Sequence, residues 1–451
     1  MVMPQRKRQA ILPKVTSTTR RTWKGTPTRT PATRTDRSHQ ISEAGRRRAA
    51  LRRRNQWRRR TACARDYVTW RNEYPEGSDR IRGVTVRRFA NSQTRDIAAF
   101  NRYSDWIFNN PHRPEDELEW LKQQGPWSPA LMEYLRRTHK NYDALIFYTY
   151  LYAPTVLGLQ IDPARSILVP TAHDEPPIHL DIFKDVFRRP RAIGYLTEVE
   201  RQFVTSTFER SAVIEETMGC GVELPPHHAY PRPAAEEATA TSEQDQVDAT
   251  TAADGDSNGG TRSQSHVASR GATFRRRHRV HGPFVLYGGR IDPGKGCEEL
   301  IEYFGTFIEN GGDASLVLMG LKLMPLPEEP FINFAGLLSE PERLQALEAA
   351  TVVSVPSPYE SLSLLALEAL AVGTPILCNA RSDVLVDHCL RSNGGLFYAD
   401  RDEFVECLKL LLADGRLRAA MGRSGREYVR RNYRWDIVLG KLDRMIARIR
   451  S

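Results

Sequence analysis

Two glycines and two cations follow one another closely in the C-terminal half of the chain. Gly288-Gly289-Arg290 comes directly after the apolar run 284–287, which predicts a buried strand. Five residues after Arg290, Lys295 opens a segment that predicts a helix as far as Phe307. Glycine lets the backbone approach a ligand closely, and an arginine fork, a lysine and a helix N-terminus all favour phosphate oxygens. We expect a diphosphate site around Gly289, Arg290 and Lys295; solvated loop charges are the alternative.

Two glutamates, eight residues apart, follow the apolar run 352–355. Glu360 lies in a loop, and Glu368 lies on a helix that is apolar nearly all round. Burying a carboxylate is costly unless its oxygens are hydrogen-bonded, and vicinal ribose hydroxyls would occupy both oxygens of Glu368. Glu360 would accept hydrogen bonds from sugar hydroxyls. A buried ion pair with an arginine is the alternative for Glu368. The intervening backbone offers N–H groups at a helix N-terminus, from Ser361, Leu362, Ser363 and Leu364.

Strand-length apolar runs alternate with gaps long enough for helices, which predicts an α/β fold with parallel sheets. In the first half, the expected strands are 83–89, 144–148, 166–171 and 192–196, and the break at Gly125-Pro126 separates two helices over 114–141. In the second half they are 284–287, 315–319, 331–334, 352–355, 375–378 and 395–398. Helices are expected at 401–412, with Asp400 and Glu403 at capping-box spacing, and at 435–450. At 451 residues, the chain suits two domains.

The charge is divided unevenly along the chain. Residues 1–60 hold 19 Lys+Arg and 2 Asp+Glu, a net of +17, whereas the whole chain carries +10, so the remaining 391 residues carry −7. This excludes an argument from overall pI for nucleic-acid binding and leaves only non-specific polyanion contact through residues 1–60. The six cysteines form no CxxC pair, which favours free thiols in a reducing compartment. No apolar run is long enough for a membrane span, so we expect a cytoplasmic protein, with peripheral attachment at the inner membrane face left open.

Composition also sets the expected boundaries. These are a basic disordered tail (1–62), an N-terminal domain (63–224), a disordered linker or insertion (225–278), a C-terminal domain (279–434) and a C-terminal helix (435–451).

The E-x7-E spacing from Glu360 to Glu368, followed by Ala369-Leu370-Ala371-Val372-Gly373-Thr374-Pro375, resembles the retaining GT-B glycosyltransferases of the family-four type, the glycosyl transferases group 1. Gly289-Arg290 and Lys295-Gly296 match the diphosphate-binding Arg and Lys of that family. The resemblance covers about residues 63–434 without the insertion. It implies two facing Rossmann-like domains with a cleft between them.

The resemblance also implies an activity and roles for single residues. The chain would move a sugar from a nucleotide-diphosphate sugar to an acceptor with retention of configuration, without metal or cofactor. Arg290 and Lys295 would neutralise the departing diphosphate, Glu360 would hold the sugar and Glu368 the ribose. Gly320 would shape the base pocket, and His173, after the strand 166–171, would face the donor sugar. A structural His173 is the alternative. The acceptor, whether lipid-linked, protein or polysaccharide, is not readable.

One short sequence motif argues for a bound metal ion. Asp400-Arg401-Asp402 has the DxD pattern of metal-dependent transferases, but it lies far in sequence from the diphosphate residues. We interpret it as a helix cap.

The chain departs from the family at its N-terminus, where Arg-rich sequence stands in place of the first strand, Gly-rich loop and helix. The tail is either a genuine basic extension or a misread start, and in either case the N-terminal domain lacks its first βα unit and leaves a sheet edge unpaired. Three other functions stay open: a catalytically impaired GT-B-like protein that binds nucleotide, a nucleotide-sugar epimerase, and a non-catalytic scaffold that binds polyanions through its tail.

Overall fold

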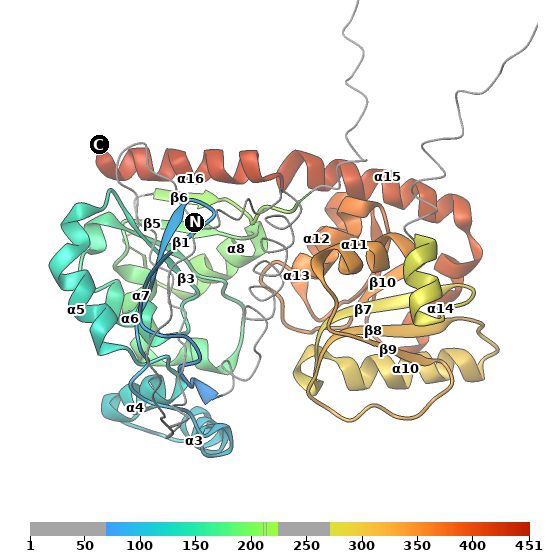
Figure 1. The fold of residues 1–451 in the computed structure, drawn as a ribbon, viewed down its shortest axis with the longest axis horizontal. Coiled ribbons are helices and arrows are strands. Elements are labelled where there is room, and N and C mark those ends of the chain that lie inside the picture. Colours follow the sequence, from blue (N-terminus) through green and yellow to red (C-terminus); the bar gives the residue numbers. More distant parts are fainter. Residues whose placement is uncertain (1–68, 211, 213, 224–270) are drawn as a thin grey trace, which may run out of the picture.

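The computed structural model describes residues 69–210, 212, 214–223 and 271–451. They form two α/β domains side by side, and the last helix runs back across the first domain (Figure 1). The expectations for residues 1–62 and for most of 225–278 lie outside the described residues. None of the described helices is both long enough and apolar enough to cross a membrane.

The N-terminal domain is built on a four-stranded parallel sheet in the order β3-β4-β5-β6. The strands are β3 (Leu145–Tyr148), β4 (Ser166–Val169), β5 (Ala192–Tyr195) and β6 (Ile214–Thr217). The α-helices are α3 (Ile97–Asn109), α4 (Pro114–Gln124), α5 (Pro129–Thr138), α6 (Ala153–Gly158), α7 (Lys184–Arg188) and α8 (Glu198–Thr207). Within the described ranges, β3 has a strand partner on one side only, so this sheet lacks the strand that a first βα unit would add.

The segment 83–89 is a strand, but its expected place in the parallel sheet is wrong. It forms β2 (Val84–Arg88), which pairs antiparallel with β1 (Gly77–Ile81) in a separate two-stranded sheet. Arg82 at φ +49° and Gly83 at φ +82° make the two-residue turn of this hairpin. Alternation of apolar and polar residues predicts a strand but does not identify the neighbouring strand.

The C-terminal domain holds a six-stranded parallel sheet in the order β12-β11-β10-β7-β8-β9. The strands are β7 (Phe284–Ile291), β8 (Ser315–Lys322), β9 (Ile332–Gly336), β10 (Val352–Val355), β11 (Ile376–Asn379) and β12 (Gly395–Tyr398). The helices are α10 (Cys297–Glu309), α11 (Glu340–Ala349), α12 (Leu364–Val372), α13 (Asp383–Ser392), α14 (Arg401–Ala413) and α15 (Gly415–Asn432). This is the α/β architecture that the sequence predicts.

Both faces of the larger sheet are covered, which explains its continuous apolar strands. On β7, Phe284 and Leu286 pack in the core that contains α12, whereas Val285 and Tyr287 pack in the core that contains α10 and α14. Helix α12 lies between the sheet and α15, and its apolar residues from Ala366 onward are buried, whereas Leu364 at its start is exposed. A polar side chain on α12 therefore needs a specific partner.

Two boundaries in the structure differ from those expected from the sequence, namely the start of the C-terminal domain and the end of its first strand. Residues 271–278 are helical and Phe274 is buried in the core, so the C-terminal domain begins before residue 279. Gly288-Gly289-Arg290 lies within β7 instead of after it, because β7 continues to Ile291 and pairs with β8 along its whole length.

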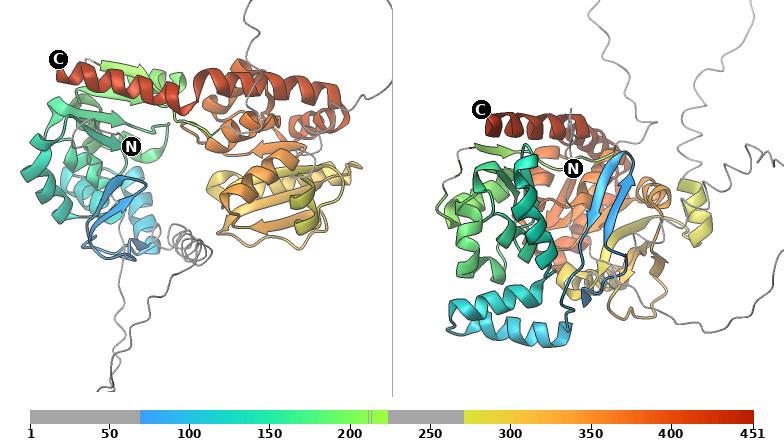
Figure 2. Two further views of the ribbon diagram at one scale, coloured as in Figure 1. Left: turned by 45° about the horizontal axis from the view of Figure 1, so that its top comes forward. Right: turned by 60° about the vertical axis from the view of Figure 1, so that its left-hand side comes forward.

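The last helix, α16 (Trp435–Arg450), has the predicted bounds and connects the two domains. It packs on β5 and β6 of the N-terminal domain, as two further views show (Figure 2). Val438, Leu442 and Met445 are buried there, and Lys441 Nζ donates to Thr217 O at 2.8 Å. The chain thus ends on the domain with which its described part begins.

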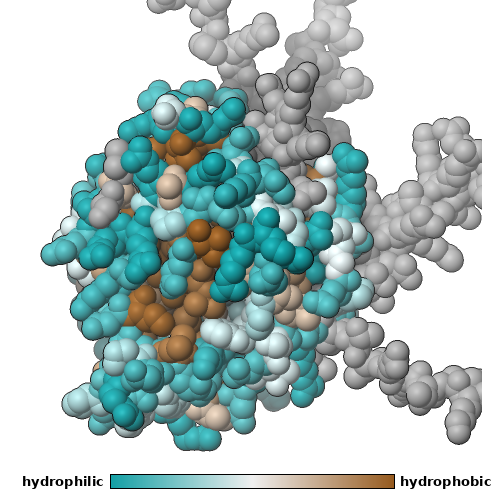
Figure 3. Space-filling view, turned by 90° about the vertical axis from the view of Figure 1, so that its left-hand side faces the viewer, coloured by the Kyte–Doolittle hydropathy of each residue, from teal (hydrophilic) through white to brown (hydrophobic). Residues whose placement is uncertain are grey.

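The outer end of the N-terminal domain is mostly hydrophilic, with a hydrophobic strip across its middle (Figure 3). Three large apolar side chains on α3 and α4, those of Ile97, Trp106 and Leu118, are exposed. Apolar residues in this domain are therefore not confined to the core.

Candidate active site

Lys295 and Glu360, 65 positions apart in the sequence, are in contact. Strands β7 and β10 are parallel neighbours, so the segments that follow them lie at the same edge of the sheet. A 3₁₀ turn (Pro293–Lys295) follows β7, and the loop before α12 follows β10. Lys295 Nζ donates to Glu360 Oε1 at 2.8 Å and to Ser357 Oγ at 3.4 Å. The two residues assigned to the diphosphate and to the donor sugar thus share one site.

Asp292 holds the cationic segment in place. Its Oδ1 accepts the backbone N–H of Lys295 at 3.0 Å, and its Oδ2 lies 3.5 Å from Nε of Arg290. The side chain of Arg290 is 48% exposed, so much of its guanidinium faces solvent. Asp292 is a residue that the sequence analysis missed, although its place between the two cations was a signal.

Gly289 and Gly320 face each other across β7 and β8. Their φ angles are +148° and +130°, which L side chains rarely adopt. A Cβ on Gly320 would lie 1.8 Å from the carbonyl oxygen of Gly289, so the two strands come this close only because Gly320 has no side chain. The pair leaves bare backbone at the edge of the sheet where Lys295 lies.

Glu368 is held by an arginine. Arg343 on α11 makes an ion pair with its Oε2, and the Glu368 side chain is 15% exposed. Burial lowers the pKa of Arg343, because desolvation disfavours its charge. The alternative expected for Glu368, a buried ion pair with an arginine, is therefore present, although the Arg343 side chain is 36% exposed. A ribose at this carboxylate would have to share it with Arg343 or displace Arg343.

His173 approaches this site from the N-terminal domain. Its ring stacks on that of Tyr359, the neighbour of Glu360, at a centroid distance of 5.9 Å. Its Nε2 lies 3.4 Å from Glu175 Oε2, whereas the expected partner Asp174 pairs with His179. Its Nδ1 is buried without a hydrogen-bond partner among the described residues. An unpartnered buried ring nitrogen in this position is available to a ligand.

Glu175 and Tyr150 complete the N-terminal side of the site, and the sequence analysis had assigned no role to either. Tyr150 OH donates to Glu175 Oε1 at 2.6 Å. Burial alone would raise the pKa of Glu175, but hydrogen bonds from His173 and Tyr150 and the charge of Lys295 together lower it. Glu175 is therefore an ionised carboxylate that lies close enough to sense Lys295 of the other domain.

Glu200 on α8 holds the backbone next to His173 in place by hydrogen bonds. Its Oε1 accepts the N–H of Ala172 and its Oε2 accepts that of Leu196, both at 2.5 Å. Glu200 is 1% exposed, and burial raises its pKa to about 8. Beside it, Thr197 Oγ1 lies 3.4 Å from Ser361 O in the loop that follows Glu360, which links the domains. Glu200 therefore positions both strand ends that face the other domain.

The loop from Ser361 to Leu364 is supported from behind by a buried histidine. His388 on α13 donates from Nε2 to Leu362 O at 2.7 Å, and its Nδ1 lies 2.9 Å from Tyr428 OH. Burial lowers the pKa of His388, so the imidazole is neutral and its Nδ1 accepts a hydrogen bond from the Tyr428 hydroxyl. Ser363, at φ +61°, turns the chain into α12. The N-terminus of α12 is thus fixed beside Glu360.

The DxD segment lies elsewhere and has another role. Asp400 accepts the N–H of Glu403 at 2.9 Å, and Glu403 accepts that of Ala399 at 2.8 Å. This is the expected cap of α14. In the part of the chain that the structure describes, no group of three or more His, Cys, Asp or Glu is placed to hold a metal ion.

The C-terminal domain resembles known proteins in sequence. Residues 272–428 match the family described as Glycosyl transferases group 1. A GDP-mannose-dependent monoacylated alpha-(1-6)-phosphatidylinositol monomannoside mannosyltransferase of Corynebacterium glutamicum is 27% identical over 180 residues, which cover 36% of this chain and 47% of that protein. A D-inositol 3-phosphate glycosyltransferase of Corynebacterium efficiens is 29% identical over 185 residues, 37% of this chain and 43% of that protein. The chain thus spans less than half of each of these two relatives.

Solved structures resemble the whole described fold. Sucrose-phosphate synthase from Thermosynechococcus elongatus aligns with a TM-score of 0.56 and 17% identity, over 83% of this chain and 86% of that one. Anabaena HepE, solved in complex with UDP and glucose, aligns with a TM-score of 0.54 and 15% identity, over 81% and 86%. At these identities the likeness establishes the architecture, which is GT-B.

Proposed function

We propose that this chain, whose C-terminal domain belongs to the glycosyl transferases group 1, transfers a sugar from a nucleotide-diphosphate sugar to an acceptor with retention of anomeric configuration. The observation that carries the proposal is the contact of Lys295 Nζ with Glu360 Oε1, at 2.8 Å. The contact supports the proposal because it brings together the cation that we assign to the leaving group and the carboxylate that we assign to the sugar.

Lys295 and Arg290 act on the diphosphate. When the bond between the anomeric carbon and the diphosphate breaks, negative charge grows on the leaving oxygen. A lysine, an arginine and the nearby N-terminus of α12 stabilise that charge. The bare backbone of Gly289 and Gly320 gives the diphosphate room to lie close to the strands. The proposal needs neither a bound metal nor a cofactor.

The two glutamates hold the rest of the donor. Glu360 gives up its contact with Lys295 and accepts hydrogen bonds from sugar hydroxyls, while Lys295 turns to the phosphate. Glu368 accepts the ribose hydroxyls, which share this carboxylate with Arg343 or displace it. Each charge therefore has a partner both with and without the donor.

His173 contacts the donor sugar from the other domain. The stacking on Tyr359 supports this role, because it holds the ring next to the Glu360 segment, and Nδ1 has no hydrogen-bond partner among the described residues. The acceptor enters from the N-terminal side. Its chemical class, which is lipid-linked, protein or polysaccharide, is to be determined by the product assay below.

The five cysteines within the described residues are all free, which supports a reducing, cytoplasmic location.

A product assay tests this function. The purified full chain is incubated with UDP-, GDP- and ADP-sugars and with acceptors of the three classes. Release of the nucleoside diphosphate and the anomeric configuration of the product are followed by NMR. We expect one donor to be consumed and an α-linked donor to give an α-linked product; an inverted product would contradict retention.

One observation favours a second candidate, a GT-B protein that binds nucleotide but transfers sugar poorly. Strand β3 is an edge strand within the described residues, so the part of the chain that the structure describes holds no βα unit before it on the acceptor side. Nucleotide binding without turnover of any donor in the same assay would establish that candidate in place of the first.

A further inference from the structure

Positive charge gathers on the two last helices, away from the Lys295–Glu360 site. Residues 415–450 carry 11 Lys+Arg and 3 Asp+Glu, a net of +8, although residues 61–451 as a whole carry −7. Helices α15 and α16 run one after the other along one side of the molecule (Figure 1). A concentrated positive field of this kind attracts anions.

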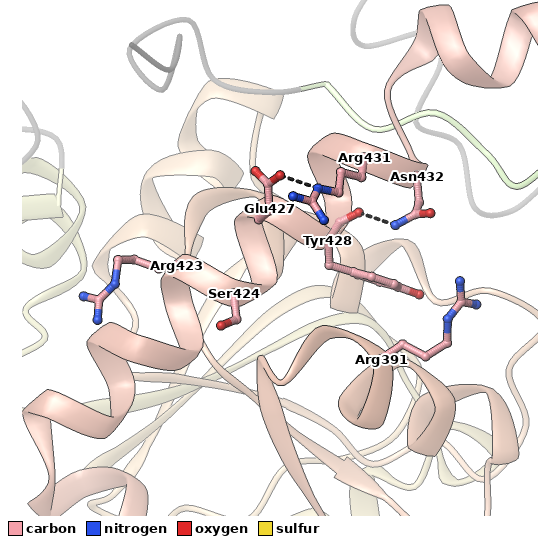
Figure 4. A pocket seen from close by; sticks show the side chains of 7 residues that line it. All are labelled: Arg391, Arg423, Ser424, Glu427, Tyr428, Arg431 and Asn432. Carbon is pink, nitrogen blue, oxygen red and sulfur yellow. Dashed lines mark hydrogen bonds and ion pairs between the residues drawn. The ribbon is translucent and has the colours of Figure 1, made fainter. Parts of the chain in front are cut away.

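A pocket of about 500 Å³ opens on this side, between α13 and α15 (Figure 4). Three arginines line it, together with a hydroxyl and an amide that can also donate hydrogen bonds. The lining residues are Arg391, Arg423, Ser424, Glu427, Tyr428, Arg431 and Asn432. The pocket is therefore rich in donors and carries more positive than negative charge.

The arginines differ in what they already bind. Arg391 pairs with Asp387 at 3.3 Å and lies over the ring of Tyr428, while Arg431 pairs with Glu427. These contacts fix two guanidinium groups in place. Arg423 has no ion-pair or hydrogen-bond partner among the described residues, and it is exposed where it lines the pocket. One cation is thus free for a ligand beside two that are preorganised.

The single carboxylate in the lining does not cancel this charge. Glu427 accepts hydrogen bonds from Arg430 and Arg431, and these arginines lower its pKa to about 2. Its oxygens are occupied by two arginines, of which only Arg431 lines the pocket. The remaining lining cations, Arg391 and Arg423, lie at opposite ends of the lining, with Tyr428 between them (Figure 4).

The inner wall of the pocket is rigid. Tyr428 OH bonds to the buried His388 at 2.9 Å and lies 3.2 Å from Tyr433 OH, so the ring over which Arg391 lies is held at its far end. A preformed wall lowers the entropy cost of binding, because the side chains need not be ordered by the ligand.

We propose that this pocket is a second anion site, separate from the Lys295–Glu360 site, and that its ligand carries a phosphate group. Arginine forks match the oxygens of a phosphate, and Ser424 and Asn432 add neutral donors to the same space. The phosphate belongs either to a soluble phosphate ester or to a lipid headgroup, since both present the same oxygens.

The test uses the full chain with Lys295→Ala, which removes the lysine of the diphosphate site. Binding of inorganic phosphate is measured by calorimetry at constant ionic strength. Binding to phosphatidylcholine vesicles with and without phosphatidic acid is measured by co-sedimentation. In this background we compare Arg423→Ala with Arg416→Ala, which removes an exposed arginine of the same helix outside the pocket. Both variants lose one charge, so contact of residues 1–60 with anions affects them equally.

We expect Arg423→Ala to weaken binding about tenfold and Arg416→Ala to leave it unchanged, as for loss of one charge-assisted hydrogen bond. Loss in the phosphate arm alone identifies a soluble ester, and loss in the vesicle arm identifies a headgroup. Equal weakening by both variants, or no binding in either arm by a chain that melts cooperatively, overturns the proposal.

Discussion

Lys295 Nζ and Glu360 Oε1 lie 2.8 Å apart at the edge of the larger sheet, where β7 and β10 bring their following segments together. Each is the other's partner in the absence of a donor. A diphosphate and a sugar would separate them and take one each. This exchange is the physical basis of the proposed function, and the predictions below follow from it and from the residues around it.

Gly320→Ala should damage the site by steric conflict. The new Cβ would lie 1.8 Å from the Gly289 carbonyl oxygen, so β7 and β8 must move apart, and we expect a loss of about 3 kcal/mol in the free energy of unfolding and loss of nucleotide binding. Urea unfolding and calorimetry measure these.

Gly336→Ala is the matched control for that variant. Gly336 also has a positive φ, +74°, but a Cβ there meets nothing within 4 Å. It should cost only the backbone strain, about 1 kcal/mol. Equal losses for the two glycines would show that strain, and not the close approach of the strands, accounts for Gly320.

Glu368→Ala and Arg343→Ala distinguish the two interpretations of their ion pair. If Glu368 holds the ribose, its removal weakens nucleotide binding about 10- to 100-fold, because charge-assisted hydrogen bonds are lost. Arg343→Ala then leaves the affinity unchanged or improves it, since a competitor for the carboxylate is gone. Calorimetric titration with the bound nucleoside diphosphate measures both. Full affinity in Glu368→Ala would reduce the pair to a structural contact.

His173→Ala should lower kcat about 100-fold and leave the affinity for the nucleoside diphosphate unchanged. The nucleotide residues lie in the other domain, while His173 meets the sugar as charge develops. Steady-state kinetics with the identified donor give the split. His179→Ala, which removes a nearby exposed histidine paired with Asp174, should behave as the parent chain. Unchanged turnover in His173→Ala would leave His173 as a structural residue.

Glu200 should make stability depend on pH. Burial raises its pKa from 4.5 to about 8, so between these values the folded chain binds one proton more than the unfolded chain. The free energy of unfolding therefore falls as pH rises through this window, by up to about 1.4 kcal/mol per pH unit. Urea unfolding at pH 5.5 and pH 8, compared between the parent chain and Glu200→Gln, isolates this group. The same slope in both would contradict a raised pKa.

Much of the C-terminal domain could be predicted because parallel strands covered on both faces are continuous apolar runs. The candidate site could be predicted in part for a related reason. Lys295 and Glu360 follow two such strands, and the ends of parallel strands gather at one edge. The apolar runs did not predict the length of the strands. Strand β7 continues beyond Gly288 and Gly289, because glycine interrupts the apolar pattern without ending the strand.

The sequence analysis assigned no role to Glu200 or Glu175, for a different physical reason. Thr197 and Glu200 have the spacing of a capping box, and Glu200 N does bond to Thr197 Oγ1 at 3.0 Å. The carboxylate, however, points away to Ala172 and Leu196, a choice set by packing between strands. Likewise, the pairing of Glu175 with His173 and Tyr150 depends on side-chain directions at two strand ends. Neither is encoded in local spacing.

The most direct test of the account is the rate of nucleoside diphosphate release from the identified donor in Lys295→Ala, with Lys409→Ala as control. Lys409 is an exposed lysine on α14, paired with Glu406 and outside the site. The account predicts that Lys295→Ala lowers kcat/KM about 100- to 1000-fold, as for removal of one group that stabilises transition-state charge, while Lys409→Ala matches the parent chain. Equal kcat/KM in the two variants would contradict a catalytic site at Lys295 and Glu360.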